Sequence, residues 1–449
     1  MKTGHVSPDV VVIGAGPTGC VTALAHARTG ARVLLLEAHP EAAKRLAGEW
    51  LHPPGAEILK QLDIGPIPAS LGYPTGCGFV FFPGDGTPPI VLDYADSSAG
   101  LACEHRTLVA ALREAAASHP DVQYVPFAKV TGIDGQRLSY TKGERGGAAS
   151  VSAERIVGAD GRSSIVRRCL RLPPDRTHVS CMAGVLLEDV ELPYEGFGHV
   201  LLGGPGPMFI YRISPRHVRA CLDVPSYNGS CAEGTASMLE AYGPTLPTQL
   251  LPAFRQALHD RPIAWAANYF RSRAHYGRDG LTLVGDAVGH FHPLSAVGLT
   301  LGFMDAQCLA RSKSIEVYCQ EQRTRTRVPE LLAKALYEAL TLEGEGGAAM
   351  RNAIYRMWRQ DPSERLRTMR LLAVQETDVF EFCRPFLKAM ALATECVIKD
   401  MAFTRRWHRP VQVLGTLGER FAWLASSVLP GAIRPWTGAG ARALPRLAK

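Results

Sequence analysis

Apolar residues along the first forty positions fall into two short runs separated by a longer mixed stretch. The first run, Val10 to Ile13, is continuous and β-branched, which is typical of a central strand in a parallel sheet. Residues 18–29 predict a helix that Gly30 ends. The segment RVLLLE at 32–37 predicts a second strand. The pattern therefore begins with a strand, a helix and a strand.

Two further apolar runs predict strands, one that ends at Val157 and one over residues 281–284. A helix is expected from about 299 to 310, and the pattern is helical from 313 to 436. Within that region the segment 328–342 is amphipathic. Its apolar residues at helical spacing are Val328, Leu331, Leu332, Ala335, Leu336, Ala339 and Leu340. These patterns predict an α/β chain with a helical C-terminal region.

The first predicted strand runs directly into the glycine turn GAGPTG at 14–19. Gly14 permits the tight turn, Gly16 lets the backbone approach a pyrophosphate, and Gly19 lets the helix pack on the sheet. The phosphates would lie at the start of the helix, where free N–H groups and the helix dipole favour negative charge. This order of elements predicts a dinucleotide site; a tight turn without a ligand is the alternative.

Glu37 ends the second predicted strand, where its carboxylate can accept hydrogen bonds from a ribose. An acid at this position argues against a 2′-phosphate, so NADP is not expected at this site. The glycine turn and Glu37 do not separate FAD from NAD.

Two later motifs favour a flavin. In GADG at 158–161, Asp160 stands in a turn before a helix that Ser163 or Ser164 can cap. In GDAVGHFHPLSAVG at 285–298, Asp286 follows a buried strand and can bind the sugar-chain hydroxyls of a flavin. Gly298 would allow close approach to a flat ring, and the helix after it can stabilise negative charge at the ring. His290 and His292 lack a third clear ligand, so we expect no metal site.

In this order the three motifs resemble the single-component flavin-dependent monooxygenases of the aromatic-hydroxylase superfamily. Within that superfamily the chain is most similar to the squalene monooxygenase (squalene epoxidase) family. The likeness covers most of the chain. Beyond the three motifs it rests on the segments at 44–62, 102–116, 207–224 and 328–362, and on HPLSAVGLT at 292–300.

The resemblance implies a Rossmann-like FAD-binding domain, interleaved with a mixed-sheet substrate domain and followed by a C-terminal helical region. The FAD-binding domain would comprise 1–175 and 268–312, with a substrate-side segment inserted near 65–100. The substrate-side sheet would comprise 176–267, and the helical region 313–449. The residues expected to contact FAD are Gly14, Gly16, Pro17, Gly19, Glu37, Ala38, Arg45, Arg106, Val130, Asp160, Gly285, Asp286, Pro293, Gly298 and Leu299.

The resemblance also implies the reaction, in which one atom of O₂ passes through a flavin C4a-hydroperoxide into a lipophilic or aromatic substrate. Electrons would come from NAD(P)H or from a reductase, because no second complete glycine turn with an acid is visible. Two alternatives stay open. One is hydroxylation of an aromatic side chain on a peptide or protein during cofactor maturation. The other is an FAD-dependent reductase of a prenyl lipid that inserts no oxygen.

Two positions depart from the family pattern. Phe79 stands where the family has an active-site tyrosine, and SAVG at 295–298 replaces a run of glycines. Both changes put squalene itself in doubt as the substrate. The patterns single out no catalytic residue; Phe79, Phe81 and Tyr211 are candidates for the pocket wall.

Composition adds little specific chemistry. The net charge of +7 on 449 residues is only mildly basic, so no nucleic-acid partner is expected. Eleven cysteines without paired spacing predict reduced thiols. Neither a signal peptide nor a spanning apolar run is visible, so a cytoplasmic location is expected. The C-terminal helices either pack on the catalytic body or lie on the inner face of a membrane and take a lipophilic substrate from it.

Overall fold

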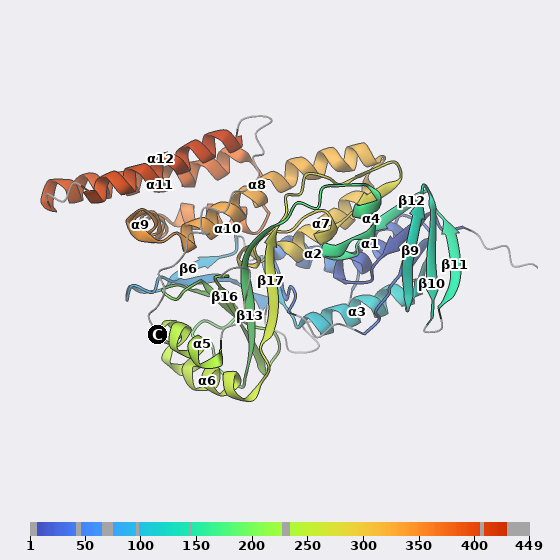
Figure 1. Ribbon diagram of the computed structural model, residues 1–449, viewed down its shortest axis with the longest axis horizontal. Coiled ribbons are helices and arrows are strands. Elements are labelled where there is room, and N and C mark those ends of the chain that lie inside the picture. The colour runs from blue at the N-terminus through green and yellow to red at the C-terminus, as the bar shows by residue number, and fades with distance from the viewer. Residues whose placement is uncertain are drawn as a thin grey trace, which may run out of the picture.

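The computed structural model describes residues 7–41, 46–64, 75–95, 98–143, 146–226, 234–404 and 408–428. Two large sheets and a group of C-terminal helices make up most of the molecule (Figure 1). Two small sheets complete it: the first is β3 (Trp50–Leu51), β7 (Gly100–Ala102) and β4 (Thr75–Gly76), and the second is β11 (Gly147–Ser152), β10 (Arg137–Lys142) and β9 (Ala128–Asp134).

The first large sheet has six strands and is parallel except at one edge. In spatial order its strands are β18 (Gly277–Arg278), β19 (Leu281–Leu283), β12 (Arg155–Gly158), β1 (Val10–Ile13), β2 (Val33–Leu36) and β8 (Val122–Val125). Only the β18–β19 pair is antiparallel. The helices that accompany this sheet are α1 (Pro17–Ala27), α2 (Pro53–Gln61), α3 (His105–Ser118), α4 (Ile165–Cys169) and α7 (Gly298–Arg311). The predicted strands at 10–13 and 281–284 and the helix near 299–310 are therefore present.

The second large sheet is mixed and has seven strands. In spatial order they are β17 (Ala264–Phe270), β13 (Thr177–Glu188), β16 (His217–Val224), β15 (Met208–Arg212), β14 (Phe197–Leu201), β5 (Gly78–Phe82) and β6 (Ile90–Asp93). Only the β14–β5 pair is parallel. Strands from 78–93 thus join strands from 177–270, and β17 crosses the boundary expected at 267.

Alternation along these strands gives the mixed sheet two different faces. Met208 and Ile210 of β15 face helices α5 (Thr235–Tyr242) and α6 (Leu251–Asp260), which cover the outer side. Phe209 and Tyr211, one residue out of phase, join an aromatic cluster on the other side. The sheet therefore separates an outer core from a core that borders the FAD-binding half.

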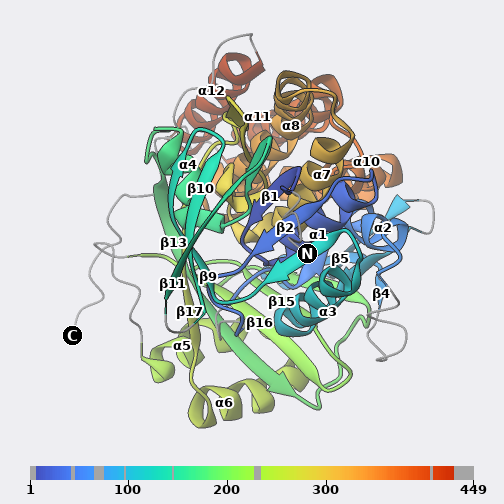
Figure 2. The same ribbon diagram turned by 90° about the vertical axis from the view of Figure 1, so that its right-hand side faces the viewer.

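The C-terminal region is helical, as predicted. It comprises α8 (Ile315–Thr341), α9 (Gly344–Gln360), α10 (Pro362–Leu372), α11 (Val379–Thr404) and α12 (His408–Val428). Helices α11 and α12 lie side by side at one edge of the molecule in both ribbon views (Figures 1 and 2). Among the described residues, no helix is long and apolar enough to cross a membrane.

The cysteines depart from the expectation at one position. Nine of them are free thiols: Cys20, Cys77, Cys103, Cys169, Cys221, Cys308, Cys319, Cys383 and Cys396. Cys181 of β13 is instead disulfide-bonded, so the prediction of reduced thiols throughout is wrong there. Sequence spacing could not reveal it, because the fold decides which sulfur atoms come within bonding distance.

Candidate active site

The carboxyl ends of four neighbouring strands carry the predicted cofactor motifs. Gly14 follows β1, Glu37 follows β2, Asp160 follows β12 and Asp286 follows β19. Because these four strands are parallel neighbours, the four positions share one edge of the sheet. Ligands of open parallel sheets bind at this edge.

The glycine turn after β1 leaves open space above the start of α1. Gly14 has φ +97°, and a Cβ there would lie 2.8 Å from the carbonyl oxygen of Ala159. A Cβ on Gly19 would clash with the carbonyl oxygen of Gly14, whereas one on Gly16 would meet no atom within 4 Å. No side chain caps α1, and Pro17 occupies its first turn. The turn is thus a cradle whose free N–H groups can bind an anion.

Glu37 lies beside this cradle in a fixed orientation. Its carboxylate accepts hydrogen bonds from the N–H groups of Ala15 (2.7 Å) and His39 (2.8 Å). Arg113 of α3 forms an ion pair with it (3.3 Å) and donates to the carbonyl oxygen of Ala15 (2.8 Å). Arg113 and Glu37 are both largely buried, with 14% and 13% of their side chains exposed. Ala38, the next residue, is half-buried.

Two arginines of α3 have different surroundings. Arg106 is 69% exposed and pairs with Glu104 (3.1 Å), while Arg113, two helical turns further on, reaches Glu37. Sequence reasoning missed Arg113; the signal was a charged residue next to the buried stripe of Leu108, Val109 and Leu112. Val130 is half-buried on β9 against the core of the parallel sheet. Arg45 lies outside the described residues.

A buried ion pair holds the backbone of the turn that carries Asp286. Arg273 and Asp305 contact each other with 2% and 0% of their side chains exposed. Asp305 accepts from the N–H of Gly285 (2.8 Å), and Arg273 donates to the carbonyl oxygens of Gly285 (3.1 Å) and Gly289 (3.0 Å). Burial raises the pKa of Asp305, and Arg273 opposes that rise. No sequence pattern predicted this pair, because its members are 32 residues apart.

Asp286 and Asp160 have different surroundings. Asp286, on the 3₁₀ turn Gly285–Ala287, is 37% exposed and pairs with Arg162 (3.3 Å). Asp160 accepts from the N–H of Ile165 at the start of α4 (2.6 Å), and burial raises its pKa. Its other carboxylate oxygen is buried without a hydrogen-bond partner among the described residues. Asp286 can therefore meet a ligand directly, whereas Asp160 mainly shapes its loop.

Helix α7 presents a second uncapped N-terminus. Pro293 begins a 3₁₀ turn, Ala296 has φ +53°, and Val297 precedes the helix without a side-chain cap. A Cβ on Gly298 would meet no atom within 4 Å, and Leu299 packs against Gly48. Since a Cβ on Gly285 would lie 2.9 Å from Thr18 Oγ1, the start of α1 packs against the Asp286 turn.

The two histidines of the 285–298 segment lie in different surroundings. His292 bonds to Asp223 of the mixed sheet (2.9 Å). His290 is buried, and burial lowers its pKa to about 4; among the described residues neither of its ring nitrogens has a hydrogen-bond partner. In the part of the chain that the structure describes, no group of three or more His, Cys, Asp or Glu could hold a metal ion.

An aromatic cluster borders the Pro293 turn on the side of the mixed sheet. Phe79, only 1% exposed, lies 5.2 Å from the ring of Trp50 and 5.7 Å from that of His52. Trp50 Nε1 donates to the Tyr94 hydroxyl (2.9 Å), Tyr94 donates to His52 Nδ1 (2.8 Å), and His52 Nε2 donates to the Ser295 carbonyl (3.1 Å). Burial lowers the pKa of His52 to about 4, so this ring stays neutral.

The other two pocket candidates lie in the same cluster. Phe81 contacts Trp358 of α9, with ring centroids 4.9 Å apart. Tyr211 is buried, and its hydroxyl donates to Glu49 (3.3 Å), which pairs with Arg219 (2.9 Å). Burial raises the pKa of Tyr211 well above its usual range. The structure therefore brings Phe79, Phe81 and Tyr211 together.

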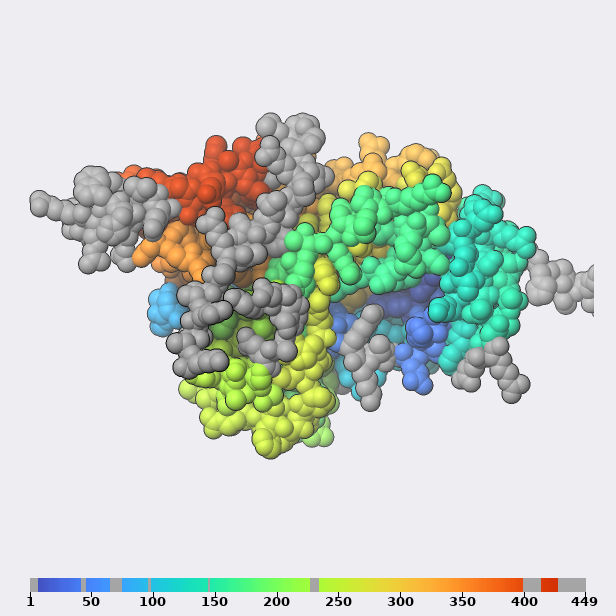
Figure 3. All heavy atoms as spheres, viewed as in Figure 1, coloured from blue at the N-terminus to red at the C-terminus, as the bar shows by residue number. Residues whose placement is uncertain are grey.

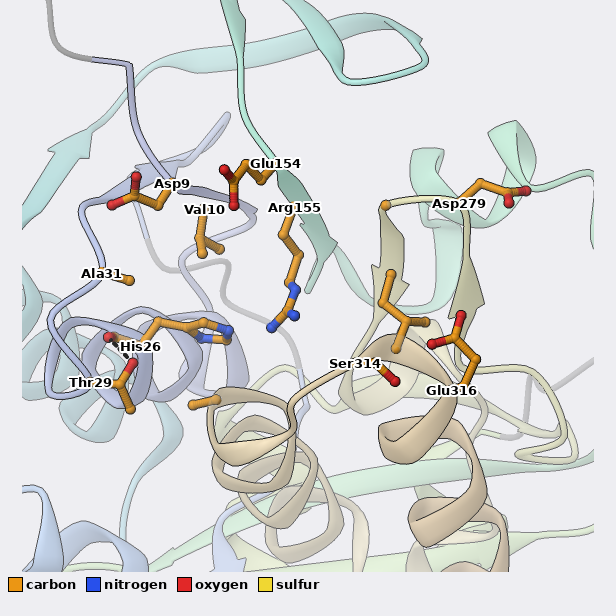
Figure 4. A pocket seen from close by; sticks show the side chains of 13 residues that line it. Asp9, Val10, His26, Thr29, Ala31, Glu154, Arg155, Asp279, Ser314 and Glu316 are labelled. Atoms are coloured by element: carbon orange, nitrogen blue, oxygen red, sulfur yellow. Dashed lines mark hydrogen bonds between the residues drawn. The ribbon is translucent and has the colours of Figure 1, made fainter.

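Two cavities bear on the location of the site. One, of about 520 Å³, lies at the amino ends of β1 and β12, where Asp9, His26 and Arg155 line it (Figure 4). It is at the opposite edge of the sheet from the glycine cradle, so it is not the cofactor site. The second, of about 100 Å³, is apolar and lies between helices α8 to α12.

The residues at the carboxyl edge fit a flavin dinucleotide. Two helix N-termini without side-chain caps suit a pyrophosphate and the electron-rich edge of a flavin ring: Gly16 precedes α1, Gly298 begins α7, and a Cβ on either glycine would meet no atom within 4 Å. Glu37 suits the adenosine ribose, and Asp286 suits the sugar chain between them. No other pair of helix starts among the described residues combines these features with the predicted motifs.

Comparisons with known proteins agree with this geometry. The squalene epoxidase family model matches residues 152–403, and the model for FAD dependent oxidoreductases matches residues 9–64. Squalene epoxidase erg1 of Aspergillus fumigatus is 28% identical over 386 residues, which are 78% of this chain and 79% of that protein. Squalene monooxygenase of Rattus norvegicus is 24% identical over 421 residues, 88% of this chain and 72% of its own length.

Solved structures show the same fold. A flavoprotein/dehydrogenase from Cytophaga hutchinsonii superposes with a TM-score of 0.69 at 18% identity, covering 88% of this chain and 99% of its own. The p-nitrophenol 4-monooxygenase PnpA from Pseudomonas putida gives a TM-score of 0.65 at 19% identity, covering 85% and 98%. With its family match, its fold and its cofactor edge, the chain belongs to the squalene epoxidase family and is an FAD-dependent monooxygenase.

Proposed function

We propose that this monooxygenase transfers one oxygen atom to a carbon–carbon double bond of an extended lipophilic polyene. The observation that carries the proposal is a series of packed aromatic side chains between the Pro293 turn and the apolar cavity of the C-terminal helices. Phe79 stands at the turn, Phe81 follows on the same strand, and Trp358 contacts Phe81 and also lines the apolar cavity. Such apolar surfaces suit a hydrocarbon chain. The squalene named in its relatives' descriptions belongs to the same class.

When bound, FAD supplies the activation of O₂ and the delivery of one of its atoms. The chain binds and orients the reactants around it. The N–H groups at the start of α1 would hold the pyrophosphate and Glu37 the ribose, while the start of α7 would stabilise negative charge at the ring. The buried aromatic cluster excludes water from the face where the double bond would lie.

The hydrogen-bonded chain through His52 has a positioning role in this scheme. Because His52 Nε2 donates to the Ser295 carbonyl, its neutral ring leaves Nδ1 to accept from the Tyr94 hydroxyl. Tyr94 in turn accepts from Trp50 Nε1. Each proton in these hydrogen bonds thus lies on a defined atom. The hydrogen bonds together hold the Pro293 turn against the aromatic cluster. Tyr94 also brings to the cluster the hydroxyl that Phe79 lacks.

We further propose that the enzyme takes its substrate from a membrane surface through α10 to α12. Exposed apolar side chains gather on these helices: Leu366, Phe380, Leu387, Ile398, Leu414 and Phe421. Phe380 is 78% exposed and Phe421 54%. These helices form one border of the space-filling view (Figure 3). Exposure of several large apolar side chains to water on neighbouring helices costs free energy, and a lipid surface would cover all of them at once.

The membrane proposal is tested by sedimentation with phosphatidylcholine vesicles. The double variant Phe380→Ser, Phe421→Ser should leave most of the protein in the supernatant, whereas the parent protein sediments. Phe127→Ser is the matched control, because Phe127 is 44% exposed but precedes β9, away from the C-terminal helices. Equal sedimentation of the double variant and the parent would contradict the proposal.

The substrate proposal is tested on purified protein loaded with FAD. We would supply O₂ and electrons with squalene, a tyrosine-containing peptide or a geranylgeranyl lipid in separate reactions, and identify products by mass spectrometry. An epoxide formed from squalene, with no product from the peptide and no hydrogenated lipid, supports the proposal. Hydroxylated tyrosine would favour action on a peptide or protein, and a hydrogenated lipid without added oxygen would favour a reductase.

The electron donor is either NAD(P)H itself or a separate reductase. Anaerobic mixing of the FAD-loaded protein with NADPH or NADH separates the two. Bleaching of the flavin absorbance within a catalytic turnover would show direct reduction, and an unchanged spectrum that bleaches only after a reductase is added would show a protein partner.

A further inference from the structure

Asp223, near the end of β16, is a buried carboxylate surrounded by hydrogen-bond donors. It is 1% exposed. One oxygen, Oδ1, accepts from Ser180, from Asn268 (3.2 Å) and from His292 Nε2 (2.9 Å). The other, Oδ2, accepts from the Tyr337 hydroxyl (3.1 Å). Within the described ranges, no lysine or arginine forms an ion pair with it.

The proton on His292 is placed by the hydrogen bonds of its two ring nitrogens; besides Asp223, Nε2 lies near Ser180 Oγ (3.1 Å) and Asn268 Nδ2 (3.2 Å). Its Nδ1 accepts from the backbone N–H of Leu294 (3.2 Å), so a neutral ring must carry its proton on Nε2. That proton points to Asp223. His292 is 4% exposed and begins the 3₁₀ turn Pro293–Ser295. One imidazole therefore joins the carboxylate of the mixed sheet to the turn expected against the flavin ring.

Tyr337 extends this connection to α8. Its ring packs on that of His292, with centroids 4.2 Å apart, while its hydroxyl bonds to Asp223. The residues on either side of it, Leu336 and Glu338, line the apolar cavity between α8 and α12. Helix α8, which borders the cavity, thus contacts the Pro293 turn through the ring of Tyr337 on that of His292.

We infer that Asp223 is a positioning residue that acts through His292 to fix the Pro293 turn beside the flavin ring, and through Tyr337 to join that turn to the cavity wall. The second half rests on the proposed function, since it assigns the cavity to the substrate. In productive turnover O₂, two electrons, two protons and the polyene give the epoxide and water. A displaced turn allows the same O₂, electrons and protons to leave as hydrogen peroxide.

Two substitutions at one position test the connection. In His292→Gln the side-chain N–H₂ can still donate to Asp223, while in His292→Asn the amide oxygen can still accept from Leu294 but the donor no longer reaches Asp223. We expect His292→Asn to raise the dissociation constant for FAD about tenfold. It should also change the visible circular dichroism of bound FAD, which reports the surroundings of the ring. His292→Gln should match the parent in both.

This readout needs no substrate, so it stands even if the polyene proposal fails. Two results would overturn the inference. In one, both variants bind FAD with the affinity and dichroism of the parent; in the other, both lose FAD affinity to the same extent. The thermal midpoint of each FAD-free protein identifies a variant that is merely unfolded; if His292→Asn is unfolded, Asp223→Asn takes its place, because a neutral amide is a weaker acceptor for the Nε2–H of His292 than the carboxylate.

The second half of the inference has its own readout. In Tyr337→Phe the ring still packs on His292, but the hydroxyl that bonds to Asp223 is gone. With the polyene present, we expect this variant to release at least about threefold more hydrogen peroxide per O₂ consumed than the parent. An unchanged peroxide fraction would refute the link to the cavity wall. If the parent forms no epoxide, the polyene proposal fails, and the FAD readouts alone decide the role of Asp223.

Discussion

Arg113 and Arg106 stand on one helix but lie in very different surroundings. Arg113 is largely buried and contacts both Glu37 and the backbone of the glycine turn, whereas Arg106 is exposed beside Glu104. If Glu37 binds the ribose as proposed, an arginine that orients both this carboxylate and the glycine turn affects the cofactor through both. The family resemblance assigns the contact to Arg106, and the geometry favours Arg113.

We therefore predict opposite outcomes for two matched substitutions. Arg113→Met should raise the dissociation constant for FAD about tenfold, because it removes the ion pair with Glu37 and the hydrogen bond to the Ala15 carbonyl. Arg106→Met should leave it within about twofold, as expected for an exposed ion pair. Quenching of FAD fluorescence on binding measures both, and the reverse order would restore the assignment to Arg106.

The Arg273–Asp305 pair makes a second prediction at this scale. Asp305→Asn leaves the guanidinium of Arg273 buried without its counter-charge, which should cost about 3–5 kcal/mol of stability. Asp279→Asn is the control, because Asp279 is 87% exposed and 3.7 Å from Arg278. Chemical denaturation followed by tryptophan fluorescence should show a large loss in the first variant and almost none in the second. Equal loss in both would contradict the role of the buried pair.

At the scale of elements, the short apolar runs and the glycine turn were informative. The continuous run at 10–13 predicted a central parallel strand, because a strand covered on both faces has no polar alternation, and the run at 281–284 predicted another buried strand. Those predictions of the fold are confirmed. The contacts of Arg113, the Arg273–Asp305 pair and the donors around Asp223 were not visible, because each joins residues that only the tertiary fold brings together. The choice of cofactor residues remains a prediction.

The cavity between α8 and α12 predicts dependence on substrate length. Ala389 of α11 lines it and is buried, so Ala389→Leu should partly fill the apolar space with little loss of stability. The KM for a long polyene should rise about tenfold, while that for a polyene too short to reach the cavity should stay within about twofold. Steady-state kinetics with a series of polyene lengths measure this. A uniform change across the series would contradict the assignment of the cavity.

For the whole molecule, buried histidines predict how stability depends on pH. Burial lowers the pKa of His26, His52, His199 and His290 from 6.5 to about 4. The unfolded chain therefore binds more protons between pH 6.5 and 4, so stability is complete above that window and falls as the pH decreases through it. Each pKa unit corresponds to about 1.4 kcal/mol.

The thermal midpoint of the FAD-free protein should accordingly fall between pH 7 and pH 5. His199→Phe removes one of these histidines from a buried position on β14 and should make the decrease shallower. Substitution of the exposed His259 should leave the slope unchanged. A midpoint that is constant from pH 7 to pH 5 would show that these rings are not held neutral in the folded state.

At the same scale, the two halves of the molecule meet at the Pro293 turn. The parallel sheet presents the cofactor edge, the mixed sheet presents an aromatic face, and α8 to α12 add an apolar cavity behind Trp358. A flavin bound at the proposed edge would lie between water-excluding surfaces, which would suit the proposed transfer of oxygen to a hydrocarbon.

The most direct test of this account is the origin of the oxygen in the product. FAD-loaded protein would be supplied with electrons, a lipophilic polyene and ¹⁸O₂ in ordinary water, and the product analysed by mass spectrometry. We predict a product that carries a single ¹⁸O atom and water that carries the other. A product without ¹⁸O, whether reduced, isomerised or oxygenated from water, would contradict the assignment of this chain as a monooxygenase.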